Sequence, residues 1–391
     1  MEYEFQPVIV VVAFNRLKSL KRILDSLDKA IYRNPVRLVI SIDNNGKNTD
    51  VKDAADTFIW KHGDKEVLYR NGHLGLRKHV LTCGDLVYNY GSIIMLEDDL
   101  VVSPFFYKYT LGALQFYGKD PAIAGLSLYN LPYAEAWKLP FIPILDDSDV
   151  YFKQVPSSLG QVWTRDQWDS FRKWYDQGHN TDLIKKLPWI VKQYWTETSW
   201  KKYFYGYIIE ENKYFVYPQI SFTTNFNDQG ANMMVKSHYG QVRLEISDRQ
   251  YKFKSLQDAI NVYDAYSEIL PDRLQKLNPE LSSYDFDVDL YGIKDYFLKP
   301  FVLTSKNVSN PVLGFERTMK PIEMNVVYNI PGNDLVLARR EDVSLKPASI
   351  EKFISEFTYF YRNVFDTDVL LKILFSRAKN KIKSFLGTKS K

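Results

Sequence analysis

The chain contains a single cysteine, Cys83, among its 391 residues, so no disulfide bond can form within it. A chain without disulfides fits a reducing compartment, and Cys83 falls in a helical pattern typical of a core residue. The first apolar run, residues 7–14, is too short to cross a membrane, because it ends at Asn15 and Arg16. No secretory leader is apparent at the start of the chain. We therefore expect a cytoplasmic protein.

Glycine-rich phosphate-binding motifs are lacking as well. The first predicted strand runs into Ala13-Phe14-Asn15-Arg16, where a dinucleotide-binding fold or a P-loop would carry several glycines. Dehydrogenases and P-loop enzymes are therefore excluded, and a sugar nucleotidyltransferase is disfavoured because a triphosphate generally needs a glycine-rich turn. A large excess of positive charge is also lacking: the formal net charge is +4, which argues against a nucleic-acid partner.

Strand and helix patterns alternate through the first third of the chain. Buried strands are predicted over residues 7–14, 36–42, 67–69, 92–96 and 123–129, and helices over 17–30, 49–62, 74–90 and 103–117. This alternation predicts an α/β fold with a mostly parallel sheet and helices on both faces. Such sheets bind ligands beyond the carboxyl ends of their strands.

Three acids, Glu97-Asp98-Asp99, stand at the carboxyl end of the strand predicted over 92–96. Carboxylates at this place suit a divalent cation such as Mg²⁺ or Mn²⁺ together with a phosphate-bearing ligand. Solvated charge at an ordinary strand end is the alternative. The many aromatic residues, Tyr 28, Phe 24 and Trp 8, are compatible with sugar stacking, although core packing accounts for most of them.

Several of these segments carry a resemblance to a known family. They are VIVVVAFNRLKSLKRILDSL from Val8, the acid Asp43 after the second strand, the helix start His73-Leu74-Gly75-Leu76, and IIMLEDDLVVSPFFYKY from Ile93, followed by DPAIAGLSLYN. Over roughly residues 6–245 the chain resembles glycosyltransferases of the GT-A fold, above all N-acetylglucosaminyltransferase I and its bacterial relatives. The resemblance implies an inverting transferase that uses a nucleotide-sugar, commonly UDP-linked, with Mn²⁺.

The resemblance also implies roles for residues that bind the nucleotide. Arg16 would meet the nucleotide, Asp43 would accept a hydrogen bond from the uracil imide, and His73 would lie near the nucleotide. Other readings stay open for each: a solvated cation at a helix start for Arg16, a turn former for Asp43 and a locally hydrogen-bonded residue for His73.

For the acidic triplet, the resemblance implies that Glu97 and Asp98 face the base and ribose, and that Asp99 is the single protein ligand of the metal. A divalent cation on Asp99 would offset the charge that grows on a departing diphosphate. One carboxylate leaves the other coordination sites to phosphate and water.

Further along, Pro156 to Trp163 resembles the segment of the family that lines the donor sugar, which makes Trp163 a candidate for stacking on acceptor or sugar, with core packing as the alternative. The run Tyr194 to Trp200 occupies the place of the family's catalytic base, an Asp directly before the tryptophan. Here Ser199 holds that position and Glu197 is the only acid in the run.

Glu197 is therefore the predicted base, with a role as an exposed helix acid as the alternative and with Asp166 and Asp228 in reserve. Ser237 to Gln241 resembles the loop that orders over the bound donor, so His238 is predicted to contact the pyrophosphate.

Three regions are predicted: a GT-A catalytic domain over 1–245, a helical and β-rich extension over 246–365, and a basic amphipathic tail over 366–391. The extension combines a helical pattern over 256–277 with alternating runs over 284–345. The tail has the profile of a helix that lies on an anionic membrane surface. A helix packed on the domain is the alternative.

The sequence thus predicts a metal-dependent inverting hexosyl- or N-acetylhexosaminyltransferase. It would act on a saccharide or lipid-linked saccharide in surface polysaccharide or glycolipid synthesis, as a peripheral protein on the inner face of the cell membrane. The alternatives are a non-catalytic nucleotide- or sugar-binding module at the membrane and a sugar nucleotidyltransferase.

Overall fold

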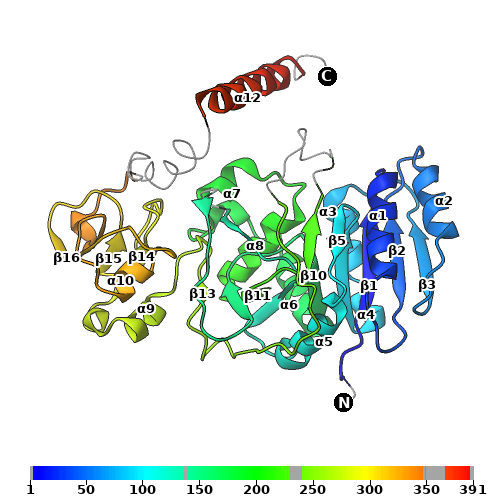
Figure 1. Cartoon of the computed structure of the whole chain (residues 1–391), viewed down its shortest axis with the longest axis horizontal. Helices are drawn as coiled ribbons and strands as arrows, with labels where there is room; N and C mark the ends of the chain where they lie inside the picture. Colours follow the sequence, from blue (N-terminus) through cyan, green and yellow to red (C-terminus); the bar gives the residue numbers. More distant parts are fainter. Residues whose placement is uncertain are drawn as a thin grey trace. The chain divides into compact units, whose positions relative to one another are not determined.

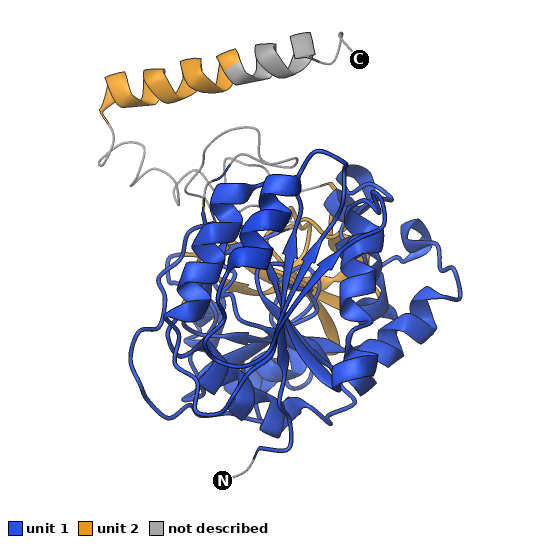
Figure 2. Cartoon of the chain, turned by 90° about the vertical axis from the view of Figure 1, so that its right-hand side faces the viewer, with its two compact units in different colours: residues 1–284, 318–329 blue, residues 285–317, 330–391 orange. Residues whose placement is uncertain are grey.

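The computed structural model describes residues 3–135, 139–226, 228, 240–346, 348 and 366–387. It divides into two compact units, one of residues 1–284 with 318–329 and one of residues 285–317 with 330–391 (Figure 2). The boundary predicted near residue 245 therefore falls inside the first unit.

A nine-stranded sheet organises the first unit, in the order β13-β9-β11-β6-β10-β4-β1-β2-β3 (Figure 1). The strands are β1 Val8–Ala13, β2 Leu38–Ile42, β3 Lys65–Tyr69, β4 Ser92–Glu97, β6 Ile123–Ser127, β9 Val150–Lys153, β10 Gln161–Thr164, β11 Tyr214–Pro218 and β13 Val262–Tyr263. Five of the eight neighbouring pairs are parallel, and the pairs β4-β10, β10-β6 and β11-β9 are antiparallel. The predicted α/β class with a mostly parallel sheet is confirmed.

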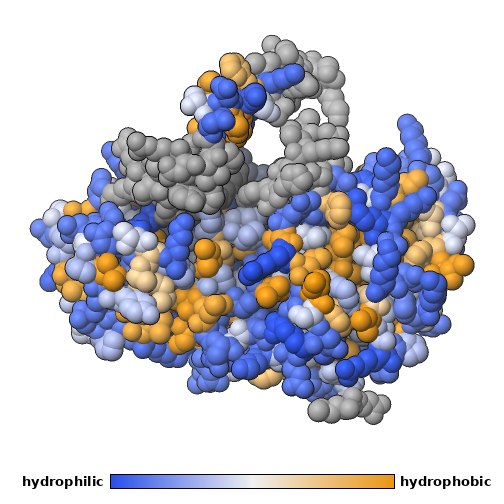
Figure 3. All heavy atoms as spheres, viewed as in Figure 1, coloured by the Kyte–Doolittle hydropathy of each residue, from blue (hydrophilic) through white to orange (hydrophobic). Residues whose placement is uncertain are grey.

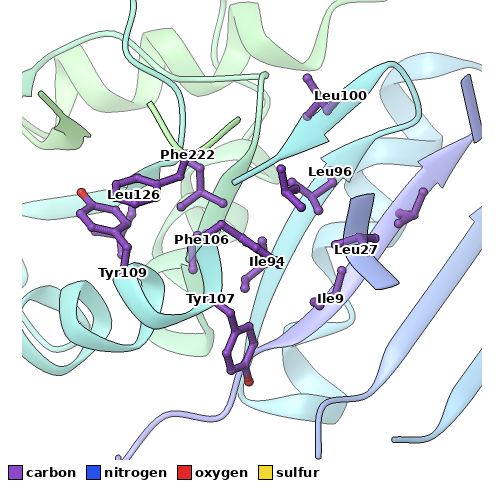
Figure 4. Packing of buried hydrophobic residues seen from close by; sticks show 14 of the residues in the cluster. Ile9, Leu27, Ile94, Leu96, Leu100, Phe106, Tyr107, Tyr109, Leu126 and Phe222 are labelled. Atoms are coloured by element: carbon purple, nitrogen blue, oxygen red, sulfur yellow. The ribbon is translucent and has the colours of Figure 1, made fainter. Parts of the chain in front are cut away.

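Helices cover both faces of this sheet (Figure 2). The helices of the first unit are α1 Leu17–Asp28, α2 Thr49–Thr57, α3 Leu76–Gly84, α4 Val87–Tyr90, α5 Phe106–Tyr117, α6 Arg165–Tyr175, α7 Trp189–Tyr194, α8 Trp200–Glu210, α9 Pro271–Leu277 and α10 Met324–Val327. Buried side chains of α1, α2 and α5 form one core with the strand residues that face them, among them Ile9, Ile94 and Leu96 (Figure 4). On the other face, Trp163 of β10 packs against rings of α6 and α8. The apolar spacing of α1, which buries Leu20 and Leu27, explains why it forms a helix on this sheet.

The helix predicted over 256–277 is wrong over most of its length. Residues 262–263 form the edge strand β13, and only Pro271–Leu277 is helical, as α9. Pro271 lacks the N–H that an internal helix position needs, and in the structure it starts the helix. The predicted helix over 74–90 is interrupted: it forms α3 and the short α4, with Asp85 and Leu86 between them. As predicted, Cys83 is buried in this region.

The second unit contains a four-stranded sheet in the order β14-β15-β17-β16, which confirms a β-rich region between 284 and 345. Its strands are β14 Phe286–Asp289, β15 Phe301–Thr304, β16 Pro311–Phe315 and β17 Leu335–Arg339. The helix α12, Thr367–Gly387, follows, and no described helix is long and apolar enough to cross a membrane. On α12 both apolar and polar side chains are exposed (Figure 3).

His79 of α3 is buried against the sheet, where its Nε2 lies 2.7 Å from the hydroxyl oxygen of Ser41 on β2. Burial, aided by the charges of Arg70 and His73 and opposed by Asp43, lowers the pKa of His79 to about 4. An unfolded histidine titrates near 6.5 and takes up its proton first as the pH falls. Between these two pKa values, the unfolded state therefore binds a proton on His79 that the folded state does not bind.

We expect the stability that His79 supplies in neutral form to be complete above about pH 6.5 and to decline toward pH 4. In urea unfolding, the free energy of the wild type should fall relative to that of His79→Gln across this window, by about 3 kcal/mol for a shift of this size. Subtracting the free energies of unfolding of the two proteins cancels the pH dependence that comes from carboxylates, because these titrate in both proteins. Parallel curves would contradict a neutral, buried His79.

Candidate functional site

The carboxyl ends of β1, β2 and β4 meet at one edge of the sheet. Because the three strands are parallel, Val12 pairs with Glu97 and Ala13 pairs with Ile42 in the ladder. The residues just beyond these strand ends therefore lie together, and three of the predicted positions stand there: Arg16, Asp43 and the triplet that begins at Glu97.

Arg16, directly before α1, forms ion pairs with two of the three acids. Its Nη1 donates to Oδ2 of Asp99 at 2.9 Å, and its Nη2 donates to Oδ1 of Asp98. Burial lowers the pKa of Arg16, but the two carboxylates raise it further, so that the net pKa lies above its ordinary value. The structure thus decides against a freely solvated Arg16.

The electrostatics of the triplet reflect how closely its charges are packed. Burial raises the pKa of Asp98 to about 6, although Arg16 opposes this shift. Burial, followed by the charge of Asp99, raises the pKa of Glu97 as well. Burial and mutual repulsion thus make the charged forms of these acids costly, and a further positive charge at this edge would offset that cost.

Asp99 offers an unused ligand atom. Its Oδ1 is buried and accepts no hydrogen bond from any residue that the structure describes. A buried carboxylate oxygen without a partner is costly, and a hard cation with oxygen ligands would satisfy it. Within the same described residues, no group of three or more His, Cys, Asp or Glu side chains could hold a metal. The geometry fits an ion that takes Asp99 from the protein and its other ligands from elsewhere.

Asp43 follows β2, and its carboxylate accepts hydrogen bonds from the backbone of the turn before α3. Its Oδ1 accepts from the N–H of Leu74 at 2.7 Å, its Oδ2 accepts from the N–H of Gly75 at 3.0 Å, and Nδ1 of His73 lies 2.9 Å from Oδ2. The exposed ring of His73 stacks on Phe14, with 5.3 Å between the ring centroids. Asp43 is therefore more than a turn former, because it joins the ends of two strand–helix units and holds His73 at the edge.

Trp163, the predicted stacking residue, lies in the core instead. It is fully buried and packs against Trp168, Trp200 and Phe204, with ring centroids 4.7 to 6.0 Å away. A ring that stacks on a sugar needs one open face, and in this structure Trp163 has none.

The three candidate bases differ in their exposure, their hydrogen bonds and their position in the fold. Glu197 is exposed, and its carboxylate accepts from Lys202 Nζ at 2.9 Å and from the Tyr203 hydroxyl, hydrogen bonds that lower its pKa. Asp228 is held on α1: although burial raises its pKa, hydrogen bonds from Arg22 and Ser19 lower it below the usual value.

Asp166 lies in the first turn of α6, which follows the antiparallel strand β10. That strand places Asp166 at the opposite edge of the sheet from Glu97. Glu197 remains a prediction, and His238 lies outside the described residues.

One charged pair was missed from the sequence. Lys201, the second residue of α8, lies 2.5 Å from Oε1 of Glu135, which follows the short strand β7, Tyr133–Ala134. A lone acid in a loop 66 residues upstream carries no pattern that would connect it with Lys201.

Comparison with known proteins gives one curated sequence relative. The chain is 24% identical over 243 residues to the alpha-1,3-mannosyl-glycoprotein 2-beta-N-acetylglucosaminyltransferase of Arabidopsis thaliana, a match that covers 58% of this chain and 48% of that protein. The chain thus spans about half the length of this relative, and the match agrees with the predicted resemblance to N-acetylglucosaminyltransferase I. No family model matches the chain.

Solved glycosyltransferase structures overlap with the chain only weakly. Mannosyltransferase PcManGT from Pyrobaculum calidifontis, in complex with GDP-Man and Mn²⁺, has a TM-score of 0.29 at 12% identity, and covers 44% of this chain and 50% of its own. S. aureus TarS 1-349 in complex with UDP-GlcNAc has a TM-score of 0.37 at 9% identity, and covers 58% and 60%. Overlap at this level is too small to support an assignment.

The bonds that Asp43 makes at the edge can be tested with Asp43→Asn. The amide keeps one acceptor oxygen but presents an N–H₂ to the other backbone donor, so a buried N–H loses its partner. We expect a loss of about 1–3 kcal/mol in the free energy of unfolding and faster hydrogen exchange at the amides of Leu74 and Gly75.

Asp53→Asn, on the exposed face of α2, is the matched control, and it should stay within about 0.5 kcal/mol of the wild type. Unchanged exchange at both amides in Asp43→Asn would contradict the role given to Asp43.

Proposed function

We propose that the chain is a metal-dependent inverting glycosyltransferase that moves a hexosyl or N-acetylhexosaminyl group from a nucleotide-sugar, UDP-linked, to a saccharide or lipid-linked saccharide. The observation that carries the proposal is the carboxylate pair Asp98 and Asp99 at the carboxyl edge of β4, bound by Arg16, with Oδ1 of Asp99 buried and without a hydrogen bond to any residue described in the structure. The sequence match to an N-acetylglucosaminyltransferase supports it.

The residues at the edge would divide the work on the donor. Asp99 would hold Mn²⁺ or Mg²⁺, which supplies positive charge to a diphosphate leaving group. Arg16 can donate two parallel hydrogen bonds to phosphate oxygens, a task for which its planar guanidinium is well suited. Asp43 and His73 would hold the nucleotide base, because Asp43 follows β2, the strand beside β1, and His73 before α3 is paired with it.

The reaction itself is a single displacement. The acceptor hydroxyl attacks the anomeric carbon from the side opposite the diphosphate, so the configuration inverts. A carboxylate accepts the hydroxyl proton as the new bond forms, a contribution typically worth 10²–10⁴-fold in rate. The diphosphate leaves with the electron pair of the broken bond.

The tail supports a place at a membrane surface. From Val369 to Lys391 the sequence has seven Lys or Arg residues and no acid. In the described part of α12, Leu371, Leu374 and Phe375 are exposed. Exposed apolar side chains among basic ones suit an anionic lipid surface, where each basic residue contributes about 1 kcal/mol. Acceptors that are lipid-linked would be found at such a surface.

Donor binding tests the proposal. UDP-GlcNAc with Mn²⁺ should raise the melting temperature of the full chain, because a ligand that binds only the folded state stabilises it, by about 2.7 kcal/mol at 100 times its dissociation constant. Asp99→Ala should lose the shift, whereas Asp64→Ala, an exposed acid before β3, should keep it.

An equal shift in Asp99→Ala would contradict the site. If a panel of UDP- and GDP-sugars binds but is never turned over, the non-catalytic module would be favoured.

For the tail, a chain truncated after Asp368 should sediment less with vesicles containing anionic phospholipid than the full chain does. The effect should weaken with added salt, because lipid charge is screened over a Debye length. Equal sedimentation of the two proteins would contradict the proposed membrane contact.

A further inference from the structure

A row of polar side chains crosses the face of the central sheet that α6 and α8 cover. The ladder places Gln161 opposite Met95, two residues before Glu97, and places Lys153 opposite Phe215. Since side chains alternate along strands, Glu97 and Gln161 point to the same face as Trp163, which contacts both helices. Buried polar groups on this face need hydrogen-bond partners, and some of them have none among the described residues.

At this face, Glu135 uses only one of its two carboxylate oxygens in contacts with described residues. Its Oε1 is held by Lys201 Nζ at 2.5 Å, while its Oε2 is buried and has no hydrogen-bond partner in the part of the chain that the structure describes. Lys153 is in a similar state: it is fully buried, its Nζ lacks a hydrogen bond to any described residue, and it lies 3.8 Å from the ring centroid of Phe141. Burial lowers the pKa of Lys153 to about 7, although Glu135 opposes the shift.

Lys201 connects this cluster with the acidic triplet. It follows Trp200, whose ring packs edge-on against Trp163 at 6.0 Å, so the start of α8 is pinned on this face of the sheet. From there the charge of Lys201 acts on Glu97 at the carboxyl end of β4 as well as on Glu135. The charge of Lys201 thus acts on both carboxylates, and Glu135 follows β6, whose end at Ser127 lies level with Met95 of β4 across Gln161.

We propose that Glu135 is the general base of the transfer and that Lys201 is its positioning residue; this rests on the proposed function. Oε2 of Glu135 takes the proton of the acceptor hydroxyl while the hydroxyl oxygen bonds to the anomeric carbon. The bond from that carbon to the diphosphate breaks, and the diphosphate leaves with its electron pair. Glu135 returns the proton to water after the product has left.

The fold favours Glu135 over the acids found from the sequence. Glu197 uses both carboxylate oxygens on Lys202 and Tyr203, Asp228 is bound by Arg22, and Asp166 stands at the wrong edge. Ser199, where the resemblance implies an acid, lies only two residues before Lys201. Glu135 therefore delivers a carboxylate to the same end of α8 from a separate segment of the chain.

The test measures donor affinity and turnover separately on the full-length protein. The probe is UDP-GlcNAc with Mn²⁺, with water as the acceptor and UDP release as the readout. We expect Glu135→Gln, which keeps the volume and an acceptor for Lys201, to bind the donor within about twofold of wild type while UDP release falls by about 100-fold or more. Glu210→Gln, at the other end of α8, is the matched control and should release UDP at the wild-type rate.

Lys201 needs a readout that distinguishes positioning from folding. Lys201→Met should lower the turnover rate with the melting temperature and donor affinity preserved, and Lys201→Arg, which restores the ion pair, should recover most of the rate. Loss of UDP release in Glu197→Gln but not in Glu135→Gln would overturn the assignment. Wild-type protein that binds donors but releases no UDP, either with water or with a panel of saccharide acceptors, would overturn the proposed function, and the base with it.

Discussion

The ion pairs between Arg16 and the aspartates Asp98 and Asp99 are the interaction on which the edge of the sheet depends. Asp98 is almost fully buried, and a buried carboxylate without a counter-charge is strongly destabilising, typically by 3–5 kcal/mol when one partner of such a pair is removed. The guanidinium is anchored by its place just before α1, and the aspartates are anchored by the end of β4. The contact therefore fixes the first helix and the central strand relative to each other.

The same contact explains why this edge suits an anionic ligand bound through a cation. Arg16 already shows that positive charge is stable there, and among the described residues nothing donates a hydrogen bond to Oδ1 of Asp99, so this oxygen can take a further ligand. A ligand with phosphate oxygens could share the guanidinium without displacing it entirely, since Arg carries five N–H donors. Asp43 extends this arrangement by tying His73 and the start of α3 to the neighbouring strand.

Prediction from the sequence succeeded where the signal was local and periodic. Val8–Ala13, Leu38–Ile42 and Ser92–Glu97 are continuous apolar runs, and such runs form buried parallel strands because both of their faces are covered. It failed over 256–277, where apolar residues at helical spacing serve an edge strand and a loop that pack on the sheet. Trp163 shows a related limit, since only neighbouring elements decide whether an aromatic ring is covered.

The sequence by itself determined the order of strands and helices, the acids at the end of β4 and the positions of Arg16 and Asp43 at adjacent strand ends. Parallel pairing follows from that alternation, and it brings residues at strand ends to one edge. Tertiary structure alone decided which carboxylates are saturated and that Glu135 meets Lys201, because contacts between distant segments depend on packing geometry and leave no periodic trace in the chain.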